Sequence, residues 1–182
     1  MAGAARLDRL PPASLPEIAF AGRSNVGKSA LLNRLLNRRK LARVSKTPGR
    51  TQQINFFSVD ERLLLVDLPG YGFARVPLAI KEQWRELVEG YLVDRRTLRA
   101  VVVLVDVRRG IEADDARLLE FLAAHDIEAL VVATKTDKVT RDARRRALAD
   151  MAARHPGVTP MPFSSATGEG APELWAAISA LA

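Results

Sequence analysis

Short runs of Val, Leu and Ile alternate along the whole chain with amphipathic stretches, and no other feature constrains the fold as strongly. Strands are predicted at residues 18–21, 54–59, 63–67, 100–106, 130–134 and 158–163. Helices are predicted between and after them, at residues 28–36, 80–93, 113–124, 141–154 and 172–181. Because most of the strand-like runs lack polar alternation, they suit a parallel sheet that helices cover on both faces.

One pair of predicted strands departs from this parallel pattern. Only Asp60, Glu61 and Arg62 separate residues 54–59 from residues 63–67, and so short a connection can join only antiparallel strands. The predicted fold class is therefore α/β, with a mostly parallel six-stranded sheet, one antiparallel strand and helices on both faces. Since no linker or repeat interrupts the chain, residues 1–182 are predicted to form one domain, with residues 1–16 as a short N-terminal extension.

The composition excludes several kinds of site. The chain has 182 residues and no Cys, so disulfides, thiolate zinc sites and Cys nucleophiles are excluded. Residues 1–16 lack the apolar core of a signal peptide, and the apolar run at residues 100–105 is too short to span a bilayer. We expect a cytoplasmic, monomeric protein without a membrane span. The net charge of +7 fits either an ordinary basic surface or a polyanionic partner such as nucleic acid.

A phosphate-binding loop is predicted directly after the first strand, where the sequence fits the pattern G-x-x-x-x-G-K-[ST]. The loop consists of Gly22, Arg23, Ser24, Asn25, Val26, Gly27, Lys28 and Ser29. The glycines let backbone N–H groups turn toward phosphates, and the following helix adds the partial positive charge of its N-terminus. Lys28 can then reach the β- and γ-phosphates, and the Ser29 hydroxyl can bind Mg²⁺. The alternative is a chance match in a glycine-containing turn, and the flanking strand and helix argue against it.

A second motif, of the form D-x-x-G, ends the strand at residues 63–67. It consists of Asp67, Leu68, Pro69 and Gly70. The Asp67 carboxylate can hold Mg²⁺ through water, and the Gly70 N–H can meet the γ-phosphate. Alone, this short pattern is more often a turn, and its place after a phosphate loop gives it weight.

The polar stretch at residues 44–53 lies between these two motifs and is predicted to be a loop. Such loops become ordered when the γ-phosphate is present and loosen after hydrolysis. Thr51 is the first candidate for a hydroxyl that closes on Mg²⁺, and Thr47 competes with it on chemical grounds. Gly49 and Arg50 are further nucleotide-binding candidates beside them.

A base-reading motif follows the strand at residues 130–134. Thr134, Lys135, Thr136 and Asp137 match [N/T]-K-x-D. A carboxylate there can accept hydrogen bonds from guanine N1–H and the N2 amino group, which adenine cannot supply, while the Lys135 stem packs on the base. Near the end of the last strand, Phe163, Ser164 and Ser165 can present backbone N–H groups to guanine O6.

These motifs, in this order, resemble the EngB (YsxC/YihA) family of bacterial ribosome-biogenesis GTP-binding proteins. The resemblance rests on residues 15–29, 46–56, 67–73, 134–138 and 163–170, with Leu174 and Trp175. It implies a Ras-like P-loop GTPase domain that cycles between GTP and GDP with Mg²⁺. It also implies a role in assembly of the large ribosomal subunit, whose precursor and rRNA would be the partner.

The resemblance bears on individual site residues as well. It favours Thr51 over Thr47 as the magnesium ligand, beside Ser29 and Asp67, and Lys28, Thr51 and Gly70 become the catalytic candidates. Tyr71 stands where many small GTPases have the Gln that orients the attacking water, so intrinsic hydrolysis is expected to be slow. Related GTPases with Asn at the position of Asn25 use K⁺; the alternative is that Asn25 only stabilises the turn.

Other functions share part of this pattern. A P-loop GTPase of another role (tRNA modification, division or membrane-linked) and, further away, a small-molecule kinase are the alternatives. Asp106 is interpreted as a polar strand-end residue without a role in chemistry. Three clusters of positive charge could contact RNA phosphates: Arg34, Arg38, Arg39, Lys40 and Arg43; Arg95, Arg96 and Arg99; and Arg141, Arg144, Arg145 and Arg146.

Overall fold

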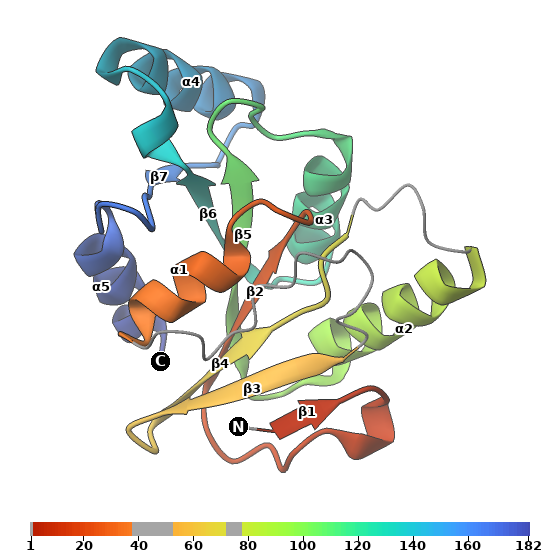
Figure 1. The fold of residues 1–182 in the computed structure, drawn as a ribbon. Coiled ribbons are helices and arrows are strands. Elements are labelled where there is room, and N and C mark those ends of the chain that lie inside the picture. The colour runs from red at the N-terminus through yellow and green to blue at the C-terminus, as the bar shows by residue number, and fades with distance from the viewer. Residues whose placement is uncertain (1, 38–52, 72–77) are drawn as a thin grey trace.

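The computed structural model describes residues 2–37, 53–71 and 78–182, and its elements follow one another in the alternating order expected (Figure 1). The strands are β1 (Ala2–Ala4), β2 (Glu17–Gly22), β3 (Ile54–Val59), β4 (Leu63–Asp67), β5 (Leu98–Asp106), β6 (Glu128–Thr134) and β7 (Met161–Pro162). The helices are α1 (Lys28–Leu35), α2 (Leu78–Asp94), α3 (Ala113–Ala124), α4 (Arg141–Arg154) and α5 (Ala171–Leu181), with short 3₁₀ turns η1 (Leu7–Arg9) and η2 (Thr136–Lys138). In the described part of the chain, every helix is too short or too polar to cross a membrane.

The strands form one sheet in the order β1-β3-β4-β2-β5-β6-β7. β2 lies parallel to both β4 and β5, and β6 lies parallel to β5 and β7. β3 pairs antiparallel with β4 through the predicted hairpin and antiparallel with β1 on its other side. Within the described sheet, β3 is therefore the one strand that runs against the rest, which confirms the predicted mostly parallel α/β fold with one antiparallel strand.

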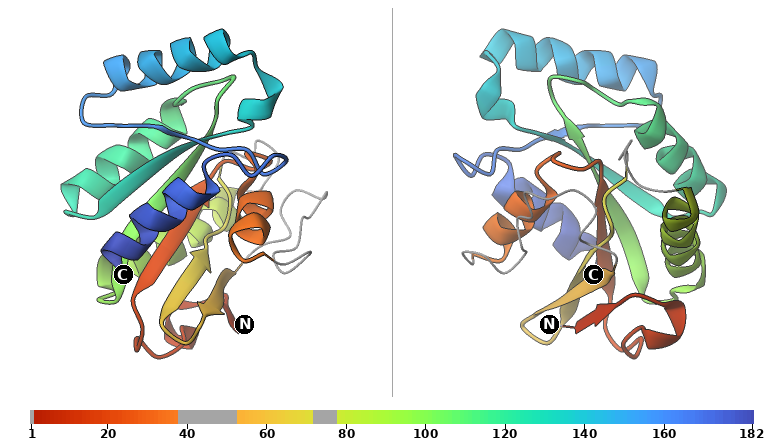
Figure 2. Two further views of the ribbon diagram at one scale, coloured as in Figure 1. Left: turned by 90° about the vertical axis from the view of Figure 1, so that its left-hand side faces the viewer. Right: turned by 45° about the vertical axis from the view of Figure 1, so that its right-hand side comes forward.

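Helices cover both faces of this sheet (Figure 2). On one face, Leu31 and Leu32 of α1 and Leu174 of α5 pack with Val102 and Leu104 of β5. On the other face, Leu87 and Tyr91 of α2 and Leu122 of α3 pack with Val101 and Val103 of the same strand. Alternate residues of β5 thus enter opposite cores, which is why this strand is apolar at every position from Ala100 to Val105.

Among the described residues the sheet has seven strands, so the predicted count of six was wrong. β1 adds to the edge through pairing of Ala2, Gly3 and Ala4 with Phe56, Asn55 and Ile54. The sequence Ala-Gly-Ala carries no β-branched or aromatic residue, so no propensity signal marks it as a strand. Its pairing depends on main-chain hydrogen bonds to an edge that the rest of the fold supplies.

The segment predicted as an N-terminal extension packs on the domain. After β1, the chain turns through η1, and Leu7 lies against α2: a Cβ built on Gly90 would stand 2.5 Å from Leu7 Cδ1. Gly90 therefore allows the close approach of these two elements.

β7 is shorter than predicted, since Met161 and Pro162 alone pair with β6 out of the expected residues 158–163. Pro160 and Pro162 have no N–H to donate to a ladder, which limits the length of this edge strand. Phe163 is nevertheless fully buried, and its N–H donates to the Ala133 carbonyl at 2.9 Å. The chain that follows is thereby held beside the end of β6.

Candidate nucleotide-binding site

All described motif residues lie at the carboxyl edge of the sheet. The phosphate loop follows β2, Asp67 ends β4, Thr134 ends β6, and Phe163 follows β7. In open α/β sheets this edge is where ligands bind. The alternation of strands and helices therefore brings together residues that stand 110 positions apart along the chain, as in the hydrogen bond from Lys135 Nζ to the Asn25 carbonyl.

The phosphate loop turns sharply from β2 into α1. Gly27 caps the helix with φ of 112°, a value that side-chain-bearing residues rarely adopt, and Lys28 begins the helix. Asn25 also has a left-handed backbone, with φ of 65°, and is exposed, whereas Val26 beside it is buried in the core. The first turn of α1 thus directs its backbone N–H groups toward the loop, as anion binding at a helix N-terminus requires.

Lys28 and Asp67 are in direct contact across the site. The Lys28 ammonium donates to Asp67 Oδ1, and both side chains are about nine-tenths buried, with 11% and 9% of their surface exposed. Ser29 follows Lys28 in the first turn of α1. A hydroxyl and a carboxylate are the oxygen ligands that Mg²⁺ prefers, so Ser29 and Asp67 fit the ion that a nucleotide would bring, and the phosphates would share Lys28.

The D-x-x-G segment lies against the phosphate loop. Leu68 and Pro69 are buried, and the Leu68 N–H donates to the Phe20 carbonyl at 3.1 Å. A Cβ built on Gly70 would stand only 3.1 Å from Ser24 Oγ and 3.4 Å from the Gly22 carbonyl. A side chain here would require Ser24 Oγ to move by a few tenths of an ångström, so glycine allows this approach, and the Gly70 backbone lies beside the phosphate loop.

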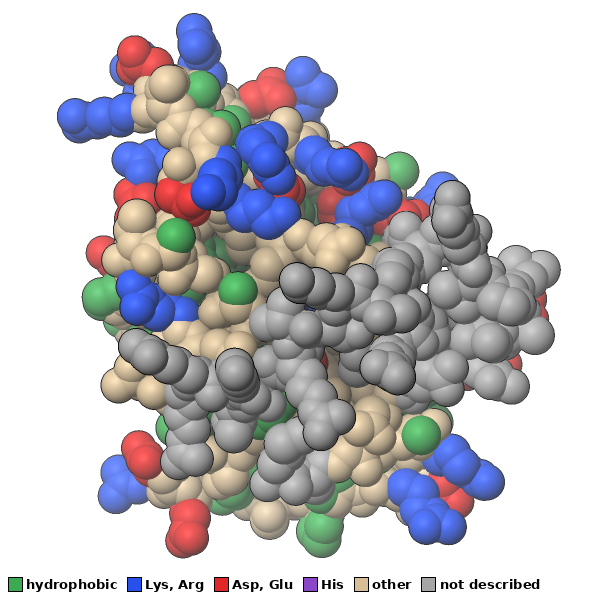
Figure 3. All heavy atoms as spheres, viewed as in Figure 1, with side chains coloured by type: hydrophobic (Ala, Val, Ile, Leu, Met, Phe, Trp, Pro, Cys, Tyr) green, Lys and Arg blue, Asp and Glu red, His purple; other side chains and the backbone are tan. Residues whose placement is uncertain are grey.

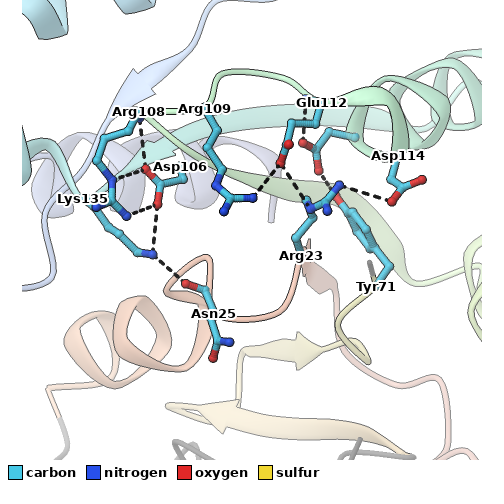
Figure 4. A network of polar contacts seen from close by, with 10 residues as sticks. Arg23, Asn25, Tyr71, Asp106, Arg108, Arg109, Glu112, Asp114 and Lys135 are labelled. Carbon is cyan, nitrogen blue, oxygen red and sulfur yellow. Dashed lines mark hydrogen bonds and ion pairs between the residues drawn. The ribbon is translucent and has the colours of Figure 1, made fainter. Parts of the chain in front are cut away.

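The base-reading motif is bonded to the phosphate loop. Thr134 Oγ1 lies 2.7 Å from the carbonyl oxygen of Val26, and Lys135 Nζ donates to the carbonyl oxygen of Asn25 at 2.6 Å. Figure 4 shows Lys135 reaching Asn25 in this way, with the Asn25 side-chain amide pointing away from it. Lys135 therefore lies along one side of the phosphate loop, where its stem can form part of the base pocket.

Asp137 and the loop after β7 are held together by side-chain contacts. Ser164 Oγ donates to Asp137 Oδ1 at 2.7 Å, and this hydrogen bond is the main cause that lowers the pKa of Asp137 below its ordinary value. Thr136 Oγ1 donates to Glu169 Oε2 at 2.9 Å, and Arg144 of α4 pairs with the other oxygen of Glu169. Ser165 follows Ser164 directly in the chain.

Some predicted residues lie outside the described part of the chain. These are Gly49, Arg50, Thr51 and the competing Thr47, and, of the first basic cluster, Arg38, Arg39, Lys40 and Arg43.

Asp106 was interpreted as a polar strand-end residue without a role in chemistry, and the structure adds its contacts with the base-reading motif. It ends β5, accepts hydrogen bonds from Arg108 at 2.6 and 2.9 Å, and pairs with Lys135 Nζ at 3.0 Å (Figure 4). Although partial burial acts in the opposite direction, these two cations hold the pKa of Asp106 well below its ordinary value. Asp106 thus fixes the Lys135 side chain. In the sequence, its position at the end of a strand between two motif-bearing strands could have indicated that it lies near the site.

The prediction that Arg95 could contact RNA was wrong, because its charge is already paired within the protein. Its guanidinium, with 8% of the side chain exposed, pairs with the fully buried Glu17 at 2.6 Å. Arg96 and Arg99 are exposed but lie at the amino end of β5, opposite the motifs.

On α4, Arg141, Arg145 and Arg146 are exposed, whereas Arg144 faces Glu169. Figure 3 shows Lys and Arg side chains gathered across the top of the molecule, over α4 and the adjoining loops, with acidic side chains among them.

Comparisons with known proteins agree with this geometry. The model of a family described as 50S ribosome-binding GTPase matches residues 17–135, more than half of the chain. A probable GTP-binding protein EngB of Solibacter usitatus is 52% identical over 94% of this chain and 89% of its own length. Its namesake in Geobacter sulfurreducens is 51% identical over 97% and 86%.

Solved structures show the same fold. The crystal structure of a probable GTP-binding protein engB superposes with a TM-score of 0.74 and 27% identity, covering 91% of this chain and 97% of that one. A structure of Era from Aquifex aeolicus has a TM-score of 0.77 at 23% identity, covering 92% of this chain and 56% of that one. The second similarity concerns the fold alone.

Proposed function

The chain belongs to the EngB family of P-loop GTPases, which hydrolyse GTP, and we propose that it is a molecular switch that assists assembly of the large ribosomal subunit. The observation that carries the proposal is the convergence at one sheet edge of the Lys28–Asp67 pair with a base-reading motif bonded to the phosphate loop. A phosphate site and a guanine site that share hydrogen bonds can respond to one nucleotide as a unit.

In this proposal each described site residue has one role. Lys28 binds the β- and γ-phosphates, Ser29 and Asp67 bind Mg²⁺, and the Gly70 N–H meets the γ-phosphate. Asp137 accepts from the guanine edge, and the hydrogen bond from Ser164 keeps its carboxylate ionised and oriented for that purpose. Thr51 is proposed to complete the magnesium site in the GTP state.

Hydrolysis without a partner is proposed to be slow. The Tyr71 hydroxyl donates to Asp115 of α3 at 2.7 Å, so the side chain that follows Gly70 is already engaged away from the phosphates. A side chain that orients the attacking water, or an arginine finger worth about 10³–10⁵ in rate, would have to come from elsewhere. K⁺ held beside Asn25 is proposed as a partial substitute.

The proposed partner is rRNA on a large-subunit precursor in the cytoplasm. The description of the matching family as 50S ribosome-binding supports this choice. So does the net charge of +7, because a basic protein gains affinity for RNA by releasing counterions from its phosphates.

A complementation experiment tests the proposed function. In a bacterium depleted of its own EngB protein, this chain should restore the mature large subunit in a sucrose gradient. Lys28→Ala should leave particles that sediment more slowly than the mature large subunit, with normal small subunits, because it removes the phosphate ligand. The matched control is Arg62→Ala, a cation removed from the exposed β3–β4 hairpin, which should behave as wild type. An unchanged large-subunit profile on depletion would instead favour a different GTPase role.

A further inference from the structure

Tyr71 connects the D-x-x-G segment to two other elements. Its own backbone forms a short parallel bridge with the phosphate loop: the Ser24 N–H donates to the Tyr71 carbonyl at 3.1 Å, and the Tyr71 N–H donates to the Gly22 carbonyl at 3.4 Å. Its side chain extends in the other direction, toward α3 (Figure 4). The peptide that joins Gly70 to Tyr71 is thus attached at one end to the phosphate loop and, through the ring, to a helix.

The contact on α3 is partly buried, and both carboxylate oxygens of Asp115 take part in hydrogen bonds. The Tyr71 hydroxyl donates to Asp115 Oδ1 at 2.7 Å, and Asp115 Oδ2 accepts the Glu112 N–H at 2.9 Å as part of the capping box of α3. Asp115 is 1% exposed. Burial, followed by the neighbouring Asp115 charge, raises the pKa of Tyr71, so its hydroxyl keeps the proton that it donates. Each oxygen of Asp115 therefore has a donor, one from each segment.

Arg23 makes a second connection between the same parts. Its guanidinium pairs with Glu112 at 3.3 Å and with Asp114 at 3.3 Å, both in or just before the first turn of α3. Phosphate loop, Gly70–Tyr71 peptide and α3 therefore form a closed ring of contacts. Gly70 directly precedes Tyr71 in the chain, so its backbone is one peptide away from these contacts.

We propose that Tyr71 and Asp115 are positioning residues for γ-phosphate recognition: their bond holds the Gly70 N–H beside the phosphate loop and so raises the affinity for GTP relative to GDP. The inference rests on the proposed role of Gly70. GDP has no γ-phosphate, so its binding does not use the position of this N–H. The first turn of α3 thereby contributes to nucleotide discrimination without touching the nucleotide.

Tyr71→Phe tests the inference, because it removes one oxygen and keeps the ring. Loss of one hydrogen-bond donor to a buried carboxylate changes an equilibrium constant by about tenfold. The affinity for a non-hydrolysable GTP analogue should fall by about that factor, while the affinity for GDP stays within about twofold. Both affinities are measured by titration with fluorescent nucleotides. In an Asp115→Ala background, the same substitution should have no further effect on the ratio, since the two groups act through one bond.

Tyr91→Phe is the matched control. Tyr91 is a fully buried tyrosine, whereas Tyr71 is partly buried, and the Tyr91 hydroxyl likewise donates to a buried carboxylate, that of Glu17 at 2.8 Å, at the other end of the sheet. It should lower the melting temperature and leave the ratio of GTP to GDP affinity unchanged. A Tyr71→Phe protein that keeps the wild-type ratio, or that loses affinity for both nucleotides equally, would overturn the inference. If the wild type bound neither nucleotide, the proposed function itself would fail.

Discussion

Asp137 and Ser164 form the contact on which base selectivity is expected to depend. Their side chains lie 2.7 Å apart, and Glu169 ties the neighbouring Thr136 to α4 through Arg144. Ser164 therefore holds the carboxylate, and Glu169 holds the residue that precedes it. A supported carboxylate loses little conformational entropy when it pairs with a base, which strengthens the preference for guanine.

Asp137→Asn should change the base preference from guanine to xanthine. The Asn amide places an N–H donor against the guanine edge, which itself presents two donors. Because this contact then becomes a mismatch, GTP affinity should fall by about a hundredfold. Xanthine has a carbonyl at that position and should be bound better by the variant than by the wild type. Titration with GTP, XTP and ATP measures both changes. Asp142→Asn, an exposed carboxylate on α4, is the control, and unchanged GTP affinity in Asp137→Asn would reject the assigned role.

Two roles could explain the presence of Asn25 in the phosphate loop: its amide binds K⁺, or its backbone stabilises the turn. The backbone angle of Asn25 suggests a substitution that distinguishes the two. Its φ of 65° is one that Asn and Gly accept readily, so the turn alone gives a reason for this residue. Asn25→Gly keeps the turn and removes the amide. If the amide holds K⁺ where charge develops, wild-type turnover should be faster in K⁺ than in Na⁺ at equal ionic strength, and the variant should show no difference. A K⁺ effect that survives in Asn25→Gly would leave the turn as its only role.

Among the elements, β2 is fixed by contacts at both of its ends. Its carboxyl end leads into the phosphate loop, and its amino end carries Glu17, which is fully buried. Glu17 accepts hydrogen bonds from Tyr91, Arg95 and Thr97 at 2.6–2.9 Å. This cluster joins β2 to α2 and to the start of β5 below the nucleotide site, so it stabilises the fold and takes no part in the chemistry.

Glu17→Gln should therefore destabilise the protein while sparing nucleotide binding. Removing one partner of a buried ion pair leaves the Arg95 charge uncompensated and costs about 3–5 kcal/mol. Urea unfolding measures this loss. Glu89→Gln breaks an exposed pair with Arg85 on α2 and should cost under ~1 kcal/mol. Equal midpoints for the two variants would contradict a structural role for the cluster.

Elements with a strong periodic or apolar signal could be predicted from the sequence, and others could not. The bounds of α3 and α4 agree with prediction at both ends, because each helix starts directly after a capping residue, Glu112 or Thr140, and stops before a break. β1 could not be found, since three small residues pair only because β3 offers an open edge. The α3 contacts with Arg23 and Tyr71 were equally hidden, because charges such as Glu112 and Asp114 read as a solvated helix start until the fold places a partner there.

For the molecule as a whole, the contribution of positive charge depends on where each arginine lies. Arg95 belongs to a buried pair and Arg144 to Glu169, so neither charge is free for a partner, although each was part of a predicted cluster. The sequence shows which residues carry charge, and only the tertiary arrangement shows which charges other groups neutralise.

A charge-removal variant of the first cluster should separate partner binding from nucleotide binding. Arg38→Ala with Arg39→Ala and Lys40→Ala should lose affinity for large-subunit precursor particles, because RNA contacts depend on the number of phosphates neutralised. GTP affinity should stay unchanged. Arg96→Ala with Arg99→Ala, two exposed cations at the end of the sheet opposite the nucleotide site, is the control and should bind particles normally. Loss of binding in the control alone would move the contact surface to that end.

Sedimentation of the wild-type protein with large-subunit precursor particles tests the switch most directly. The affinity of the protein for the particles, measured from the fraction that pellets with them, should be about tenfold higher with a non-hydrolysable GTP analogue than with GDP. In a switch, one ligand typically changes the affinity for the other by about 5–150-fold. Binding should also weaken as salt rises. Equal binding in the two nucleotide states would contradict the coupling, and binding in neither state would contradict the ribosomal role.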